Sequence, residues 1–405
     1  MVVRLLSAQW LAVGFTGLVS LGLSILIART LGPDLFGVYA IALSAGGLLA
    51  ILIDGGFSKL LQRERTRVTP TLSQVVLDLP GLSYGHAMLV VLGLSVVAVA
   101  IFPKHALTIL PTLWLFGAMV LNQFGLSILR GDGRLVRDAS LQVGNRTLAA
   151  LCVAAAFLLG ANQPWQILIA QFVGTAAFGF WVARYLRVHP IFRMSPTVYR
   201  SILPFFWLDF ATTLYQRADL LVFQFLSVPK LEVGQYGVAY RLIEAVLLLA
   251  SPVSLILFRR YRQDSELPAQ MIKSMVPTLM AAGFIGLGLA LMFWLFGRDL
   301  ISLAFGPAFQ GADQLLIVLG CALGFILPNG VLIQAFLALG LERWFAFSAA
   351  IAALVNICGN LLLIPIYGTM SAAWMTVMTQ GILGICLATG LVWRCRQPAL
   401  VEPRA

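Results

Sequence analysis

Apolar runs of about 20 residues follow one another along nearly the whole of this 405-residue chain. A bilayer core about 30 Å thick is crossed by roughly 20 residues of α-helix, which satisfies its own backbone hydrogen bonds. The pattern therefore predicts an all-α integral membrane protein with about 12 transmembrane helices. The runs are 7–28, 38–57, 78–102, 107–129, 139–159, 165–186, 202–227, 235–258, 274–296, 313–338, 345–365 and 371–393. The first run exceeds the apolar segment of a signal peptide, so we expect a retained span.

Composition supports a chain with little surface in water. The sequence is 60% hydrophobic and 11% charged, whereas a soluble domain is about 25% charged. Its net charge of +11 would suggest nucleic acid in a soluble protein, but here the charges lie between apolar runs, so no nucleic-acid partner is predicted. The five cysteines show no metal-ligand or disulfide spacing. Catalytic and nucleotide-binding motifs are also missing, so we expect no metal, no cofactor and no enzyme activity.

Basic residues predict the orientation, because Lys and Arg accumulate in cytoplasmic loops. Alternate connections, together with Arg184 at the end of the run before one of them, carry 20 of the 27 Lys and Arg residues; the opposite connections carry four, and three lie further inside runs. This asymmetry predicts that both termini are cytoplasmic. The 20 are Arg4, Lys59, Arg63, Arg65, Arg67, Arg130, Arg134, Arg137, Arg184, Arg187, Arg193, Arg200, Arg259, Arg260, Arg262, Lys273, Arg343, Arg394, Arg396 and Arg404.

The chain reads as two six-helix halves, 1–190 and 204–405, joined by a cytoplasmic linker at 191–203. Two short similarities support a repeat: 36–40 (FGVYA) resembles 236–240 (YGVAY), and 131–134 (GDGR) resembles 340–343 (GLER). Because each half holds an even number of spans, the halves would be parallel repeats related by a pseudo-two-fold axis along the membrane normal.

Several charged side chains fall inside predicted spans, where each costs at least roughly 2.5–3.5 kcal/mol on insertion scales. One interpretation is that they neutralise one another and lock helices together, since Arg241 and Glu244 are three residues apart on one helical face. The other is a cationic cavity between the halves, in which arginines bind phosphate oxygens. The residues are Asp54, Arg146, Asp209, Arg217, Asp219, Arg241 and Glu244.

Asp54, Asp78 and His86 each admit a structural and a functional interpretation. Asp54 either pairs with the basic cluster that follows it or takes part in ion coupling. Asp78 and His86 could form a proton relay, although a single His on an apolar helix is more often simply hydrogen-bonded.

With the spans placed, the chain resembles the polysaccharide (O-antigen type) flippase family of the multidrug, oligosaccharidyl-lipid and polysaccharide (MOP) exporter superfamily. The resemblance covers nearly the whole chain, with Ser371 standing where a glycine commonly follows the Pro-x-Tyr-Gly turn. The stretches that carry it are 28–33 (ARTLGP) with 36–39 (FGVY), 54–57 (DGGF) with 62–64 (QRE), 215–219 (YQRAD), 234–236 (GQY) with 239–242 (AYRL), and 356–360 with 363–368 (LIPIYG).

The resemblance implies a MATE-like fold and a transporter of a polyprenyl-diphosphate-linked glycan in the bacterial cytoplasmic (inner) membrane. It assigns the diphosphate to Arg241, Arg217, Arg146 and Arg29. Ion coupling or charge pairing then falls to Asp219, Glu244, Asp209 and Asp54. The implied partners are the lipid-linked glycan, the bilayer, and a polysaccharide polymerase with other assembly proteins. The alternatives are an ion-coupled drug or metabolite exporter of the same superfamily, and a multispan glycan polymerase or ligase.

Overall fold

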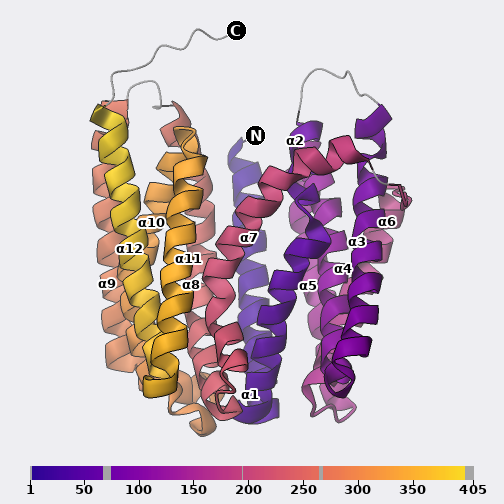
Figure 1. The fold of residues 1–405 in the computed structure, drawn as a ribbon, viewed down its shortest axis with the longest axis horizontal. Helices are drawn as coiled ribbons and strands as arrows, with labels where there is room; N and C mark the ends of the chain where they lie inside the picture. Colours follow the sequence, from indigo (N-terminus) through magenta and orange to yellow (C-terminus); the bar gives the residue numbers. More distant parts are fainter. Residues whose placement is uncertain (1, 67–73, 194, 264–267, 397–405) are drawn as a thin grey trace. The chain divides into compact units, whose positions relative to one another are not determined.

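A computed structural model describes residues 2–66, 74–193, 195–263 and 268–396. Arg67 and Arg404 of the basic loops lie outside these ranges. Within them every regular element is a helix, as predicted (Figure 1). The helices are α1 Val2–Asp54, α2 Phe57–Arg65, α3 Gln74–Ile101, α4 Ala106–Gly131, α5 Leu135–Leu158, α6 Pro164–Tyr185, α7 Pro196–Phe225, α8 Lys230–Gln263, α9 Pro268–Phe305, α10 Ala312–Ala338, α11 Glu342–Tyr367 and α12 Thr369–Arg396, with 3-10 turns at Pro103–His105 and Pro307–Phe309.

Ten helices in the described ranges are long and apolar enough to cross a membrane. One of them, Trp10–Asp54, has 45 residues and would be about 68 Å long if straight, twice what one crossing needs. It therefore carries the first two predicted spans. The seventh predicted span, 202–227, holds three charged residues and lies on α7, which is not among the ten, so this crossing stays a prediction.

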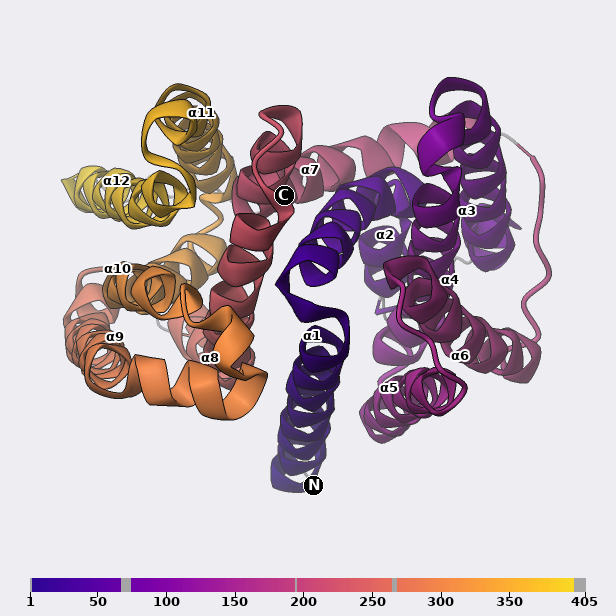
Figure 2. The same ribbon diagram turned by 90° about the horizontal axis from the view of Figure 1, so that it is seen from below.

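The break that divides α1 into two legs lies at Gly32. Its φ of 70° and ψ of 172° are not helical, and this positive φ is a conformation that glycine adopts without steric cost. Pro33 follows, where its fixed φ suits the start of a helix. Figure 2 shows the resulting bend. The sequence suggested a longer connection over 29–37, but helix continues on both sides of this one residue.

Contacts divide the chain into two compact units. The first comprises Met1–Leu221 with Pro229–Gly234, and the second comprises Val222–Val228 with Gln235–Ala405. In the first unit α3 packs on α4, α4 on α6, and α5 on α6. In the second, α9 packs on α10, α10 on α12, and α11 on α12. The same three pairings recur at the same positions in each six-helix series, as expected of repeats.

A matching backbone turn ends the fourth membrane helix of each series. At the end of α4 the Arg134 amide donates to the Leu129 carbonyl (2.8 Å), after Gly133 with a φ of 73°. At the end of α10 the Leu341 amide donates to the Phe336 carbonyl (2.9 Å), after Gly340 with a φ of 71°. Both are glycine-terminated helix ends with the same hydrogen bond. The structural equivalent of Gly340 is thus Gly133, two residues later than the sequence match suggested.

The outer faces of the units are apolar. In α5 and in α9 only 11% of the most apolar 18-residue stretch is buried inside the protein. Leu158, at the end of α5, is 89% exposed. Such faces are stable against lipid and would be costly in water. The chain is therefore a multi-pass membrane protein, as predicted.

The close approach of α1 to the first turn of α8 provides a test of the first unit. A Cβ on Gly37 would collide with the Lys230 carbonyl oxygen and lie 3.1 Å from the Gly234 amide nitrogen. Both neighbours are backbone atoms and cannot turn aside. We expect Gly37→Val to lower stability by about 1–3 kcal/mol, measured as thermal unfolding of the purified protein in detergent. Gly22→Val is the matched control, because no atom lies within 4 Å of a Cβ there; equal destabilisation by both changes would contradict this packing.

Candidate functional site

Arg146 on α5 is anchored to the first leg of α1. Its Nε donates a hydrogen bond to Ser20 Oγ at 2.7 Å, and the Ser20 hydroxyl donates to the Thr16 carbonyl at 2.5 Å. Arg146 is half-buried. A guanidinium has five N–H donors in a fixed planar fork, so it can contact several groups at once.

Arg217 on α7 lies against the second leg of α1. Ser44, which is fully buried, donates from its hydroxyl to the Arg217 carbonyl at 3.2 Å. A Cβ on Gly47 would be only 2.9 Å from both Cδ and Nε of Arg217. The absence of a side chain at position 47 therefore makes room for the guanidinium stem.

The two arginines contact α1 at similar distances from its break. Ser20 and Ser44 are each 12 residues from the break at Gly32. This spacing corresponds to about 18 Å along either leg, near the middle of an about 30 Å bilayer core. The Arg146 side chain thus meets α1 about 18 Å from the break, and the Arg217 side chain meets Gly47, which is 15 residues or about 22 Å from it. Arg29 is exposed and only three residues from Gly32, so it lies near the end of the helix.

Asp209 and Asp54 lie away from these arginines and close to α2. Asp209 Oδ1 is 2.5 Å from Lys59 Nζ, and both side chains are partly exposed. Asp54 accepts hydrogen bonds from the Gly56 amide at 3.0 Å and from the Ser58 hydroxyl. Gly55 and Gly56 have positive φ, so Asp54 ties together the backbone break between α1 and α2. This geometry gives Asp54 a local structural role.

The remaining charged residues fall on α7 and α8. Asp219 is buried, with 7% of its surface exposed, and follows Arg217 by two residues, so the two side chains leave α7 in different directions. In the second unit Arg241 Nη1 lies 2.5 Å from Glu244 Oε2, with side chains 23% and 28% exposed. The pairing expected from their spacing is present.

His86 is hydrogen-bonded within the protein, as expected of a single histidine on an apolar helix. Its Nδ1 is 3.0 Å from the Tyr199 hydroxyl and its Nε2 is 3.2 Å from the Leu52 carbonyl. Tyr199, which precedes the seventh predicted span, has a pKa raised by burial and remains protonated at neutral pH. These contacts link α3, α7 and α1.

Sequence reasoning missed the small residues that position the arginines. Ser20, Ser44 and Gly47 are ordinary members of apolar runs, and their only signal is small size or a hydroxyl on a lipid-soluble helix. It also missed α2, whose buried residues Phe57, Leu60 and Leu61 follow amphipathic spacing among basic residues.

Together these features define a class: a multi-pass helical membrane protein built from repeated helix series, with charged side chains held inside apolar bundles. A family model described as "Polysaccharide biosynthesis protein" matches residues 5–258, which include all four arginines named from the sequence. The chain belongs to this family, and the resemblance proposed from the sequence is confirmed.

Solved structures confirm the MOP-type fold. The lipid II flippase MurJ, in an inward closed conformation, is 15% identical with a TM-score of 0.79, covering 94% of this chain and 87% of that chain. An inward-facing multidrug resistance MATE family transporter is 16% identical with a TM-score of 0.64, covering 98% and 96%. A MOP superfamily transporter from Pyrococcus furiosus is 13% identical with a TM-score of 0.61, covering 97% and 95%. A sequence search among curated proteins gives no match.

The contact between Lys59 and Asp209 provides a test of how α2 packs on α7 in the first unit. Because the two side chains are 41% and 32% exposed, solvent screens the pair. We expect a coupling energy of about 0.2–1 kcal/mol in a double-mutant cycle of Lys59→Met and Asp209→Asn, followed by thermal unfolding in detergent. The double variant should be more stable than the sum of the single losses predicts. Strict additivity would mean that the ion pair does not form.

Proposed function

We propose that this protein is a flippase that moves a polyprenyl-diphosphate-linked oligosaccharide repeat unit from the cytoplasmic to the outer leaflet of a bacterial cytoplasmic membrane, for surface polysaccharide biosynthesis. The observation that carries the proposal is that the side chains of Arg146 and Arg217 contact the two legs of α1, about 18 Å and about 22 Å from its break, in a member of the polysaccharide biosynthesis protein family. The protein forms and breaks no covalent bond in this scheme, and it needs no cofactor.

Arginine suits the proposed ligand. A planar guanidinium binds two phosphate oxygens at once and stays charged at any physiological pH, so it can replace the water that a diphosphate loses in an apolar interior. We assign this role to Arg146 and Arg217 of the first unit and Arg241 of the second. Arg29, near the break in α1, is assigned to the diphosphate as it leaves at the outer side.

The carboxylates then act as exchangeable counter-charges. Glu244 holds Arg241 at 2.5 Å, and an incoming diphosphate would take its place. Such an exchange avoids an uncompensated guanidinium at any stage, which matters because breaking a partly buried pair is costly. Ion coupling, if the cycle uses it, belongs to Asp219 or Glu244 rather than to Asp54 or Asp209, whose described partners lie around α2.

The membrane potential supplies a driving force for this direction of transport. An inside-negative potential favours outward movement of an anion by about 2.3 kcal/mol per charge per 100 mV. A diphosphate that carries net negative charge in the transporter therefore moves outward by alternating access without ATP. In the cell, a polysaccharide polymerase and other assembly proteins would receive the exported unit.

The first prediction of this scheme concerns Arg241. We expect Arg241→Ala to abolish export while the protein remains inserted and abundant, because only Glu244 would remain at the diphosphate position. The measurement is surface glycan display in a strain that carries the variant as its sole copy, with membrane abundance measured in parallel. Arg260→Ala, on an exposed arginine of the same helix, is the control and should display glycan normally. Normal display with Arg241→Ala would remove this residue from the site.

The second prediction concerns Gly47. A Cβ there would lie 2.9 Å from the Arg217 side chain, so Gly47→Val should displace the guanidinium and reduce export as strongly as Arg217→Ala. Gly22→Val, on the other leg of the same helix and with open space around it, should leave export unchanged. Export at the wild-type rate in Gly47→Val would show that the observed position of Arg217 is not needed.

A further inference from the structure

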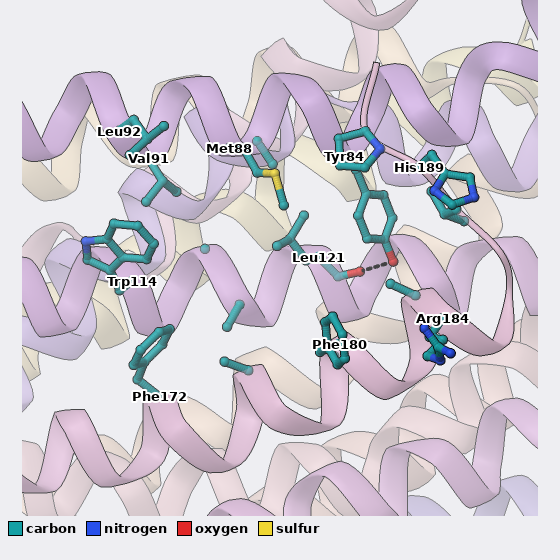
Figure 3. Close-up of a pocket in the computed structure, with 18 of the residues that line it drawn as sticks. Tyr84, Met88, Val91, Leu92, Trp114, Leu121, Phe172, Phe180, Arg184 and His189 are labelled. Atoms are coloured by element: carbon teal, nitrogen blue, oxygen red, sulfur yellow. Dashed lines mark hydrogen bonds between the residues drawn. The ribbon is translucent and has the colours of Figure 1, made fainter. Parts of the chain in front are cut away.

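A groove of about 670 Å³ opens in the first unit between α3, α4 and α6 (Figure 3). This volume is within the range of about 300–1,000 Å³ that is usual for small-molecule sites. Trp114 and Phe172 lie at one end, and Arg184 and His189 lie at the other. The Tyr84 hydroxyl donates to the Leu121 carbonyl at 3.0 Å, so this polar atom is already satisfied within the protein.

Small residues on two helices create the groove. Gly117 and Ala118 on α4 face Ala176, Gly179 and Ala183 on α6 across it. Larger side chains at Ala176 and Ala183 would narrow the groove, whereas Gly117 and Gly179 let Val91 and Asn122 pack closely at its wall. An apolar channel of this kind suits a hydrocarbon chain and offers no hydrogen bonds to a sugar.

The charged end of the groove identifies the side from which a ligand enters. Arg184 and His189 are both exposed, and they begin the arginine-rich connection 184–200. The distribution of basic residues assigns this connection to the cytoplasmic side. Basic side chains at the mouth of an apolar channel are complementary to a phosphate head group at the inner surface of the membrane.

The length of the groove fits one leaflet. From Phe172 to Arg184 is 12 residues of α6, or about 18 Å along the helix axis. A bilayer core is about 30 Å thick, so an acyl chain of one leaflet extends about 15 Å. A polyprenyl chain many isoprene units long would far exceed this length.

We infer that this groove binds an anionic glycerophospholipid of the cytoplasmic leaflet, with one acyl chain between α4 and α6 and its phosphate at Arg184 and His189. The groove is separate from the proposed diphosphate site of the first unit, where Arg146 and Arg217 contact the two legs of α1. The bound lipid bridges α3, α4 and α6 and stabilises the first unit independently of export.

The test uses purified full-length protein in detergent and phosphatidylglycerol whose acyl chains carry bromine, which quenches nearby tryptophans. Trp114 lines the groove, so its contribution is the difference between wild type and Trp114→Phe. We expect this contribution to be quenched at low lipid fraction in wild type and in Ala177→Phe, whose substitution lies on an exposed part of α6 outside the groove. In Ala176→Phe, which fills the groove, the quenching should be lost.

The head-group contact has its own variant and control. Arg184→Gln should weaken binding about fivefold, the effect of one basic side chain near an anionic surface, whereas Arg193→Gln, an exposed arginine outside the groove, should not. Because this arm does not alter the interior, it stays informative if Ala176→Phe fails to fold.

Competing ligands distinguish the sources of the same phosphate chemistry. Unbrominated phosphatidylglycerol should displace the probe, and inorganic phosphate should not. Equal binding of brominated phosphatidylcholine, unchanged binding in both Ala176→Phe and Arg184→Gln, or stronger displacement by a polyprenyl phosphate would each overturn the inference. None of these readouts depends on export activity.

Discussion

The cost of a guanidinium in a low-dielectric membrane interior is the constraint on which this structure depends. An arginine within a span is stable only beside groups that accept its hydrogen bonds or charge. In the first unit these groups lie on α1, a helix long enough to cross the membrane twice. Ser20 on its first leg accepts a hydrogen bond from Arg146, and Gly47 on its second leg leaves space for the Arg217 side chain. These contacts lie about 18 Å and about 22 Å along the legs from the break at Gly32. In the second unit Arg241 is held by Glu244 on its own helix.

Much of the fold could be predicted from the sequence because the membrane imposes so few choices. Eleven of the predicted runs coincide with helices in the ten candidate spans, α1 carrying two of them, and the glycine-terminated ends of α4 and α10 agree with a repeat. Hydropathy is a strong signal when every backbone group must be satisfied within the segment. It fails for α2, which is short and lies among basic residues, and it is weak for α7, where charges dilute the apolar run.

The candidate site was less predictable, because a charge within a span says that a partner exists but not which one. Short spacing predicted the pair of Arg241 with Glu244, since both lie on one helical face. Distant partners gave no such signal: Asp209 meets Lys59 across 150 residues, and Arg146 meets Ser20 across 126. The groove beside α6 could not be predicted for a related reason. Alanine and glycine occur in an apolar helix both where helices pack tightly and where they leave space, so the sequence does not distinguish the two.

The central claim is that Arg146 and Arg217 bind a lipid-linked diphosphate at the middle of the membrane. Equilibrium binding of a polyprenyl diphosphate and of the matching monophosphate to purified protein tests it most directly. We expect tighter binding of the diphosphate, and a loss of at least about tenfold in Arg146→Gln combined with Arg217→Gln, equivalent to about 1.4 kcal/mol. Equal affinity of the two lipids, or unchanged diphosphate binding in the double variant, would contradict it.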